Sequence, residues 1–199
     1  MSEHKTDKYK SREGFSLVEL IIAIAIMVVM VGGATLSISL IRSADTQGLA
    51  SGINGALTDL KAYTESRKGP IYMFIYKVDD DGYYAHYSFP DSSGVNSTDP
   101  GSFTPAFQEG DQRLGTDALD VKVAYDNGSG SEQIKDIKGT DYYVIQIQKK
   151  DGSYLDVKCV VGPVISVPKW FGVYKSGEDE PDYKVVLAKG TGLHYSEQQ

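Results

Sequence analysis

The chain has one cysteine, Cys159, among its 199 residues. A lone cysteine excludes a disulfide within the chain, so packing must hold the folded part together. Because Cys159 lies in an alternating apolar segment, we expect a small buried side chain rather than a nucleophile. The only histidines are His4, His86 and His194, and no two of them have the spacing of metal ligands.

Motifs for enzymatic chemistry are also missing from the sequence. It has no phosphate-binding glycine loop, no zinc pattern and no serine elbow, which predicts that the chain is not an enzyme. The formal net charge is -7. That balance disfavours a broad nucleic-acid surface, and Lys149-Lys150 is too short a basic run to make one.

Charged residues are absent from Leu20 to Ile41. At ~1.5 Å per residue this run makes about 33 Å of helix, enough to cross a hydrocarbon core of roughly 30 Å. Four basic residues shortly before the run favour a cytoplasmic location for the N-terminal end. They are Lys5, Lys8, Lys10 and Arg12. The sequence therefore predicts a single membrane-crossing helix with the rest of the chain outside the cytoplasm.

The carboxylate of Glu19 lies at the start of this apolar run. A carboxylate near the bilayer centre costs about 2.5 kcal/mol or more, and less toward the interface. The cost is explained if Glu19 finds a cationic partner once the protein leaves its monomeric state. The residues around it read Gly14-Phe15-Ser16-Leu17-Val18-Glu19-Leu20.

This arrangement, behind a lysine-containing leader, resembles the processing motif of type IV prepilins and pseudopilins, over about residues 13–41. The resemblance implies that a prepilin peptidase cuts after Gly14 and N-methylates Phe15. An amino terminus has a pKa near ~8 and stays largely cationic at neutral pH, and methylation keeps its charge. In a filament this amine would meet Glu19 of a neighbouring subunit, or fold back onto Glu19 of its own chain.

The resemblance is incomplete in two respects. Pilins commonly have a helix-breaking proline in the membrane segment, whereas no proline lies between Phe15 and Arg67. Gly32-Gly33 would supply the weak point instead, since each glycine costs ~1 kcal/mol relative to alanine in a helix; close helix–helix approach is the alternative reading. The C-terminal disulfide loop of many pilins is also missing, which favours a Gram-positive or pseudopilin-like setting.

Helical spacing continues beyond the apolar run. One apolar face is formed by Leu49, Ile53, Ala56, Leu57, Leu60 and Tyr63. Gly69-Pro70 then ends the helix. The sequence thus predicts one helix of roughly 80 Å from Phe15 to about Arg67.

Residues 69–199 have the alternation and turn signals of antiparallel strands. The predicted strands and hairpins are Ile71–Val78 with Tyr83–Phe89 around Asp79–Gly82, Leu119–Tyr125, a hairpin around Asp151-Gly152, Trp170–Tyr174 and Tyr183–Leu187. In the Asp151-Gly152 hairpin, one apolar face is expected to hold Tyr143, Ile145, Ile147, Leu155, Val157, Cys159 and Val161. Residues 90–113 are predicted to be a long loop. The expected fold is α+β, with the long N-terminal helix packed on an antiparallel sheet as in pilins.

Two acidic loops bear on metal binding. Asp79-Asp80-Asp81-Gly82 lacks the alternate spacing of a calcium loop, so we expect a solvated turn. Because some pseudopilins bind calcium in a C-terminal loop, the resemblance makes Glu178, Asp179 and Asp182 the calcium candidates. Apart from that possibility, no cofactor is expected.

These expectations divide the chain into a cytoplasmic leader (1–14), a transmembrane and filament-core helix (15–41), its amphipathic continuation (42–68) and an extracytoplasmic sheet domain (69–199). The implied function is a structural subunit of a type IV pilus or pilus-like filament. It would be a precursor in the cytoplasmic membrane and then part of an extracellular filament. Its partners would be further copies, other pilins, the prepilin peptidase and an assembly platform membrane protein.

Four alternatives stay open. The chain could be a pseudopilin of a type II secretion or DNA-uptake apparatus. It could instead be a membrane-anchored extracellular binding domain that never polymerises. The apolar run would also suit a secretory signal peptide cut near Gly32-Gly33-Ala34, or an uncut signal anchor. The amino-terminal residue of the mature protein separates cleavage at Phe15 from these last two.

Overall fold

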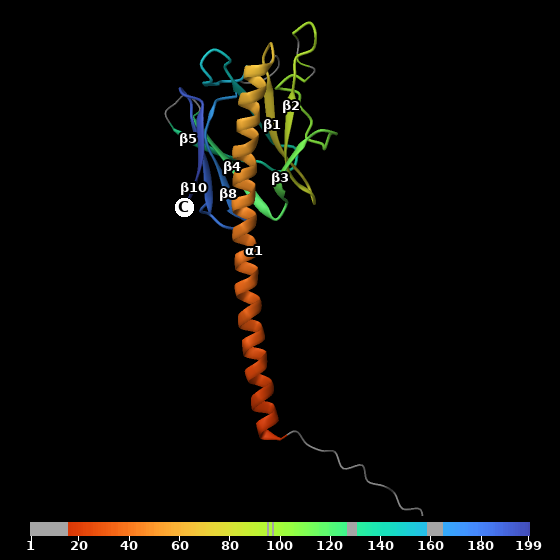
Figure 1. The fold of residues 1–199 in the computed structure, drawn as a ribbon, viewed down its shortest axis with the longest axis vertical. Coiled ribbons are helices and arrows are strands. Elements are labelled where there is room, and N and C mark those ends of the chain that lie inside the picture. The colour runs from red at the N-terminus through yellow and green to blue at the C-terminus, as the bar shows by residue number, and fades with distance from the viewer. Residues whose placement is uncertain (1–15, 95, 97, 127–130, 159–164) are drawn as a thin grey trace, which may run out of the picture. The chain divides into compact units, whose positions relative to one another are not determined.

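The computed structural model describes residues 16–94, 96, 98–126, 131–158 and 165–199, and the side chains of 32–42 lie outside that description. The chain divides into two compact units, Met1–Ile41 and Arg42–Gln199. The first unit contributes only the beginning of a helix to the described residues. The second unit contains the rest of that helix and all the strands (Figure 1).

The helix α1 runs from Leu17 to Ser66, close to the predicted Phe15–Arg67. It ends where expected, because Gly69 adopts a left-handed φ of 87° and Pro70 follows. The predicted apolar face is confirmed within the second unit. Leu49, Ile53, Ala56, Leu57 and Leu60 are fully buried, and Tyr63 packs against them.

In the described part of the chain, ten strands form two five-stranded antiparallel sheets. Their bounds are β1 Tyr72–Val78, β2 Gly82–Ser88, β3 Gln112–Thr116, β4 Leu119–Asp126, β5 Glu132–Asp136, β6 Tyr142–Ile147, β7 Tyr154–Leu155, β8 Pro168–Lys175, β9 Tyr183–Ala188 and β10 Leu193–Gln198. The strand orders are β3-β2-β1-β6-β7 and β10-β9-β8-β4-β5. The α+β prediction is confirmed, but the single predicted sheet is in fact two.

One hydrophobic core joins α1 to both sheets within the second unit. It combines Leu57 of α1 with Ile75 and Ile145 of the first sheet and with Val123 and Phe171 of the second. The chain crosses between the sheets after β3, after β5 and after β7. Alternation in a sequence shows which face of a strand is buried but not which strand lies beside it. The sequence pattern therefore could not predict that the strands form two sheets.

The two predicted hairpins are both present. The β1–β2 turn places Asp80 at a left-handed φ of 61° and is followed by full antiparallel pairing of the two strands. In the β6–β7 hairpin, Tyr143, Ile145 and Ile147 share the core as predicted. On the returning strand Tyr154 joins this core in place of the predicted Leu155, which is only partly buried. Val157 is buried as predicted, but in a second cluster with Phe74 and Val144. Cys159 and Val161 lie outside the described residues.

Three strands were not predicted. β3 begins inside the segment expected to be a loop, and β5 and β10 are edge strands of the second sheet. β5 and β10 have mostly exposed side chains on both faces, including Ile134, Leu193 and Tyr195. A strand without a buried face has no alternation to reveal it. These edges depend on backbone pairing with their neighbours for their structure.

A histidine ties the C-terminal strand to the rest of the second unit. The Nδ1 atom of His194 lies 2.8 Å from the Tyr154 hydroxyl, and its Nε2 atom lies 3.1 Å from the Thr58 hydroxyl. One imidazole thus connects β10 with β7 and α1. Burial lowers the pKa of His194, and the nearby charge of Lys61 lowers it further.

The lowered pKa of His194 predicts a loss of stability in mild acid. As the pH falls below the ordinary value of 6.5, the unfolded chain takes up the proton before the folded chain does, so the free energy of unfolding decreases. Above pH 6.5 the contribution of His194 to the free energy of unfolding does not change with pH. Urea denaturation at pH 7.5 and pH 5.5 should show a smaller decrease for His194→Gln than for the wild type. An equal decrease in both proteins would contradict this assignment.

Candidate functional site

The first residues of α1 form a capped helix start. The Ser16 hydroxyl oxygen accepts a hydrogen bond from the Glu19 backbone N–H at 3.2 Å, and the Ser16 carbonyl accepts one from the Leu20 N–H at 3.2 Å. Ser16 is therefore the N-cap residue, since its side chain satisfies a backbone donor that the helix leaves unpaired. The helix begins immediately after it, at Leu17.

Glu19 occupies the third position of this helix, in its first turn. A carboxylate there is stabilised by the partial positive charge of the helix N-terminus. Serine followed three residues later by glutamate is also the spacing of a capping box. The start of the helix therefore stabilises the Glu19 carboxylate. This role was not predicted, although the spacing of a capping box is present in Ser16-Leu17-Val18-Glu19.

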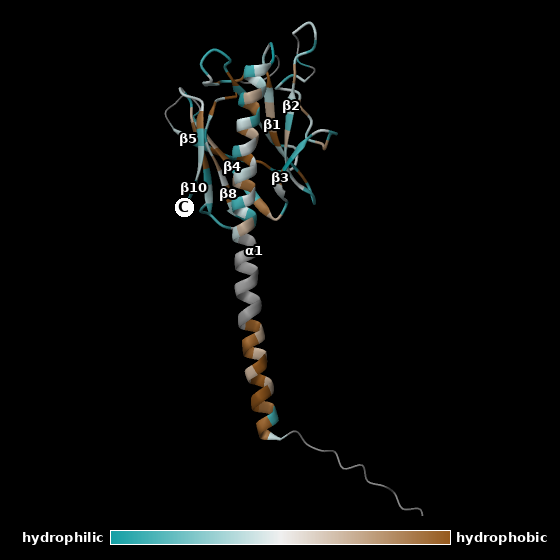
Figure 2. Ribbon diagram, in the orientation of Figure 1, coloured by the Kyte–Doolittle hydropathy of each residue, from teal (hydrophilic) through white to brown (hydrophobic). Residues whose placement is uncertain are grey.

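The part of α1 that follows Glu19 is apolar around its whole circumference. The large apolar side chains from Leu17 to Val31 are between 53% and 75% exposed. Figure 2 shows this part of α1 in brown, interrupted near its start by hydrophilic colour. A helix with apolar side chains on every face needs apolar surroundings on every face. Among the residues described, no helix meets both the length and the hydropathy needed for a membrane span.

Two predicted sites fall partly or wholly outside the description. Gly14 and Phe15, the predicted cleavage and methylation residues, precede the described residues. The backbone at Gly32 and Gly33 is helical within α1. Their suggested role as a weak point concerns the assembled state and stays a prediction.

The predicted calcium residues lie beside a small hollow at one end of the second unit. Glu178 and Asp179 line a space of about 220 Å³ together with Asp120 and Asp136. The third candidate, Asp182, instead forms an ion pair with Lys175, with Nζ and Oδ2 2.9 Å apart. Within the described part of the chain, no three acidic, histidine or cysteine side chains come together as a metal site.

A buried aspartate anchors the long segment between β2 and β3. The Asp111 side chain is 2% exposed and lies 2.7 Å from Nδ1 of His86. Its carboxylate also accepts hydrogen bonds from the Tyr76 hydroxyl and, at 2.8 Å, from the Gln108 N–H. Burial and the bond to Asp111 both raise the pKa of Tyr76. No local sequence pattern predicts this network, because its members come together only when the chain folds.

Removing this carboxylate should destabilise the second unit. Asp111→Ala leaves His86, Tyr76 and Gln108 without their acceptor, and losing one partner of a buried charged network costs about 3 kcal/mol. The midpoint of urea denaturation should fall accordingly. Asp79→Ala, which removes an exposed carboxylate, should change stability by less than about 0.5 kcal/mol. Equal effects of the two substitutions would contradict the anchoring role.

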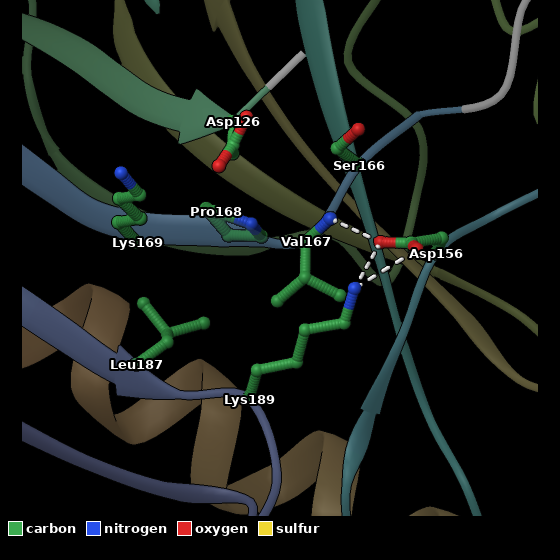
Figure 3. A pocket seen from close by; sticks show the side chains of 8 residues that line it. All are labelled: Asp126, Asp156, Ser166, Val167, Pro168, Lys169, Leu187 and Lys189. Carbon is green, nitrogen blue, oxygen red and sulfur yellow. Dashed lines mark hydrogen bonds and ion pairs between the residues drawn. The ribbon is translucent and has the colours of Figure 1, made fainter. Parts of the chain in front are cut away.

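A larger hollow, of about 480 Å³, lies where β4, β8 and β9 meet the segment after β7 (Figure 3). The Asp156 carboxylate accepts hydrogen bonds there from Lys189 Nζ at 2.8 and 2.9 Å and from the Val167 N–H at 2.9 Å. Burial alone would raise the pKa of Asp156, but these donors outweigh burial and hold it below its ordinary value. The pair is already neutralised, so it acts as a structural tie rather than as an acid or base.

One comparison with known proteins finds a match. A family model described as the prokaryotic N-terminal methylation motif matches residues 9–35. A search of curated proteins and a search of solved structures find no match. The matched segment includes Ser16, Glu19 and the beginning of the apolar part of α1.

Proposed function

We propose that this chain, whose N-terminal methylation motif marks it as a type IV pilin-like or pseudopilin protein, is a structural subunit of a type IV pilus. It would be inserted in the cytoplasmic membrane as a precursor, cut after Gly14 and N-methylated at Phe15. It would then assemble with further copies through the first part of α1. The second unit would form the surface of the filament. The role is structural and needs no cofactor.

The observation that carries this proposal is the position of Glu19 within the matched motif. The residue lies in the first turn of a helix whose following side chains are apolar on all faces. Such a helix is suited first to lipid and later to the apolar helices of neighbouring copies. The same surface would therefore serve as anchor and as packing surface.

Glu19 would set the register of each incoming subunit. The cap at Ser16 fixes the start of the helix, and with it the position of the Glu19 carboxylate. The new amino terminus at Phe15 would carry a positive charge at neutral pH. When that amine reaches Glu19 of a neighbour, both charges are compensated; at other registers each stays isolated in apolar surroundings.

Electron microscopy of material sheared from cells tests the proposal. Antibodies against residues 42–199 should decorate long surface filaments, and deletion of the gene should remove them or their label. Short fibres confined to the envelope would favour a secretion or DNA-uptake pseudopilus. Labelled protein confined to the membrane of cells with an active assembly apparatus would favour a binding domain that does not polymerise.

A further inference from the structure

Basic side chains that are distant in the sequence gather at one end of the second unit. Lys149 Nζ donates a hydrogen bond to the Arg67 carbonyl at 2.7 Å, which brings the β6–β7 turn to the end of α1. Lys61 of α1 lies against Gly152 in the same turn. Lys68 and Lys150 are the chain neighbours of Arg67 and Lys149. We call these five residues the basic end.

The basic end keeps an excess of positive charge, although the Asp151 carboxylate lies near Lys150 in the same turn and offsets part of it. In the part of the chain that the structure describes, none of the five residues forms an ion pair. Arg67 packs over the ring of Phe89 at 3.9 Å, which keeps its charge. Arg67, Lys68, Lys149 and Lys150 are exposed to solvent. A cluster of five basic side chains is unusual on the surface of a protein whose net charge is -7.

The opposite end of the second unit is acidic. β3 lies against Leu49, near the beginning of α1 in this unit, since a side chain at Gly115 would collide with Leu49. Thr116 of β3 pairs with Gly82, which places the β1–β2 turn at the same end. The loop between β8 and β9 reaches this end too, where the C-terminus lies, because the Asp182 carbonyl accepts a hydrogen bond from the Gln199 N–H at 3.0 Å (Figure 1).

Six carboxylates at this acidic end are exposed and form no ion pair among the described residues. They are Asp79, Asp80, Asp117, Glu178, Asp179 and Glu180. The nearby cations Arg113 and Lys138 are engaged by other carboxylates. Lys77 and Lys122 lie over the rings of Tyr83 and Tyr174. They offset part of the acidic charge, and an excess of negative charge is left.

The two ends are far enough apart to act independently. From Leu49 to Arg67 the helix rises by about 27 Å at ~1.5 Å per residue. This separation exceeds the Debye length of about 8 Å at physiological ionic strength, so the ends barely neutralise each other within one molecule. A second copy that brings its acidic end to the basic end of the first would pair the two surfaces directly.

We propose that the acidic end of one copy docks on the basic end of the next, a contact between second units that adds to the packing of the N-terminal helices. This inference rests on the proposed function, because it assumes assembly into a filament. The contact joins two different surfaces, so it is heterologous, and a heterologous contact whose rotation does not close a ring builds the open filament that the proposed function requires. Complementary charge would favour this orientation over contacts between like ends.

Charge reversal in the full chain tests the contact. Lys68→Glu with Lys150→Glu reverses the basic end and spares the hydrogen bond from Lys149. We expect at least tenfold less sheared filament, with normal membrane insertion and cleavage. Glu178→Lys with Asp179→Lys should have the same effect, and all four substitutions together should restore filaments. Lys135→Glu with Lys169→Glu makes the same charge change away from both ends, at lysines that pair with Asp141 and Glu132, and should leave filament yield within twofold.

The outcomes separate this inference from the proposed function. A wild-type yield of filament from either reversed variant overturns the contact and leaves the filament proposal standing. The same holds if the variant with all four substitutions does not regain its filaments. If charge reversal of the basic end leaves filaments intact but abolishes binding of the protein to a heparin column, then the basic end binds a polyanion and the inference is wrong. Absence of filaments from the wild type counts against the proposed function itself.

Cross-linking gives a readout that does not depend on yield. In a Cys159→Ser background, Lys150→Cys with Asp179→Cys should give dimers and longer ladders when filaments are treated with a short bis-maleimide. Each single cysteine variant should stay monomeric. Filaments that contain both cysteines but give no ladder would overturn the contact.

Discussion

Glu19→Ala is expected to abolish filaments while the precursor still enters the membrane and is still cut after Gly14. Without the carboxylate, the amine of each incoming subunit is left uncompensated in apolar surroundings, at a cost of about 3 to 5 kcal/mol. That cost corresponds to a decrease of roughly a hundredfold or more in assembly. Quantitative blotting of the sheared fraction against the membrane fraction measures the effect.

The helix cap provides the matched control for this experiment. Glu19 also stabilises the first turn of α1, together with Ser16, so its loss affects local helix stability as well as charge pairing. Ser16→Ala removes the capping hydroxyl at a cost of about 1 kcal/mol and keeps the carboxylate. We expect filaments from Ser16→Ala. If Ser16→Ala and Glu19→Ala lose filaments equally, then helix capping, not charge pairing, is the function of Glu19.

Gly14→Val is expected to stop processing and therefore assembly. A peptidase needs an extended backbone at the bond it cuts, and glycine, without a Cβ atom, resists helix formation there and leaves room for the enzyme. The uncut chain would keep residues 1–14, so no amine could form at Phe15. Intact-mass measurement of the membrane fraction should show the full precursor.

Gly48→Val is the control for a glycine substitution within the same chain. A Cβ atom added at Gly48 meets nothing within 4 Å beyond its own turn of the helix. We therefore expect normal cleavage and no loss of helix stability, because valine is a better helix former than glycine. Efficient cleavage of Gly14→Val, with filaments at the wild-type level, would show that processing does not depend on Gly14.

The helix and the hairpins of the fold were predictable because their causes are local. Leu49, Ile53 and Leu57 repeat at helical spacing, and Gly69-Pro70 ends the pattern. The β-branched and aromatic residues before the turn signal Asp79–Gly82 similarly located the hairpin of β1 and β2. The two-sheet arrangement depends on contacts between distant segments, such as Val123 with Phe171, that no local pattern records. Edge strands such as β10 were missed for the related reason that little of their surface is buried.

The residues of the candidate site also divide into those that a local sequence pattern predicts and those that only the folded structure brings together. Gly14, Phe15 and Glu19 could be singled out because their residue types and spacing lie within one short segment. The cap at Ser16 was equally local and was overlooked. Asp111 with His86, and Lys149 with Arg67, are brought together only by the packed second unit. Their roles therefore required the structure.

The amino-terminal residue of the protein in sheared surface material tests the account most directly. Mass spectrometry of the purified subunit, combined with sequencing from its amino terminus, identifies both the first residue and its modification. The account predicts a chain that begins at N-methylated Phe15. A chain that begins at Met1, or near Ala34, would contradict it.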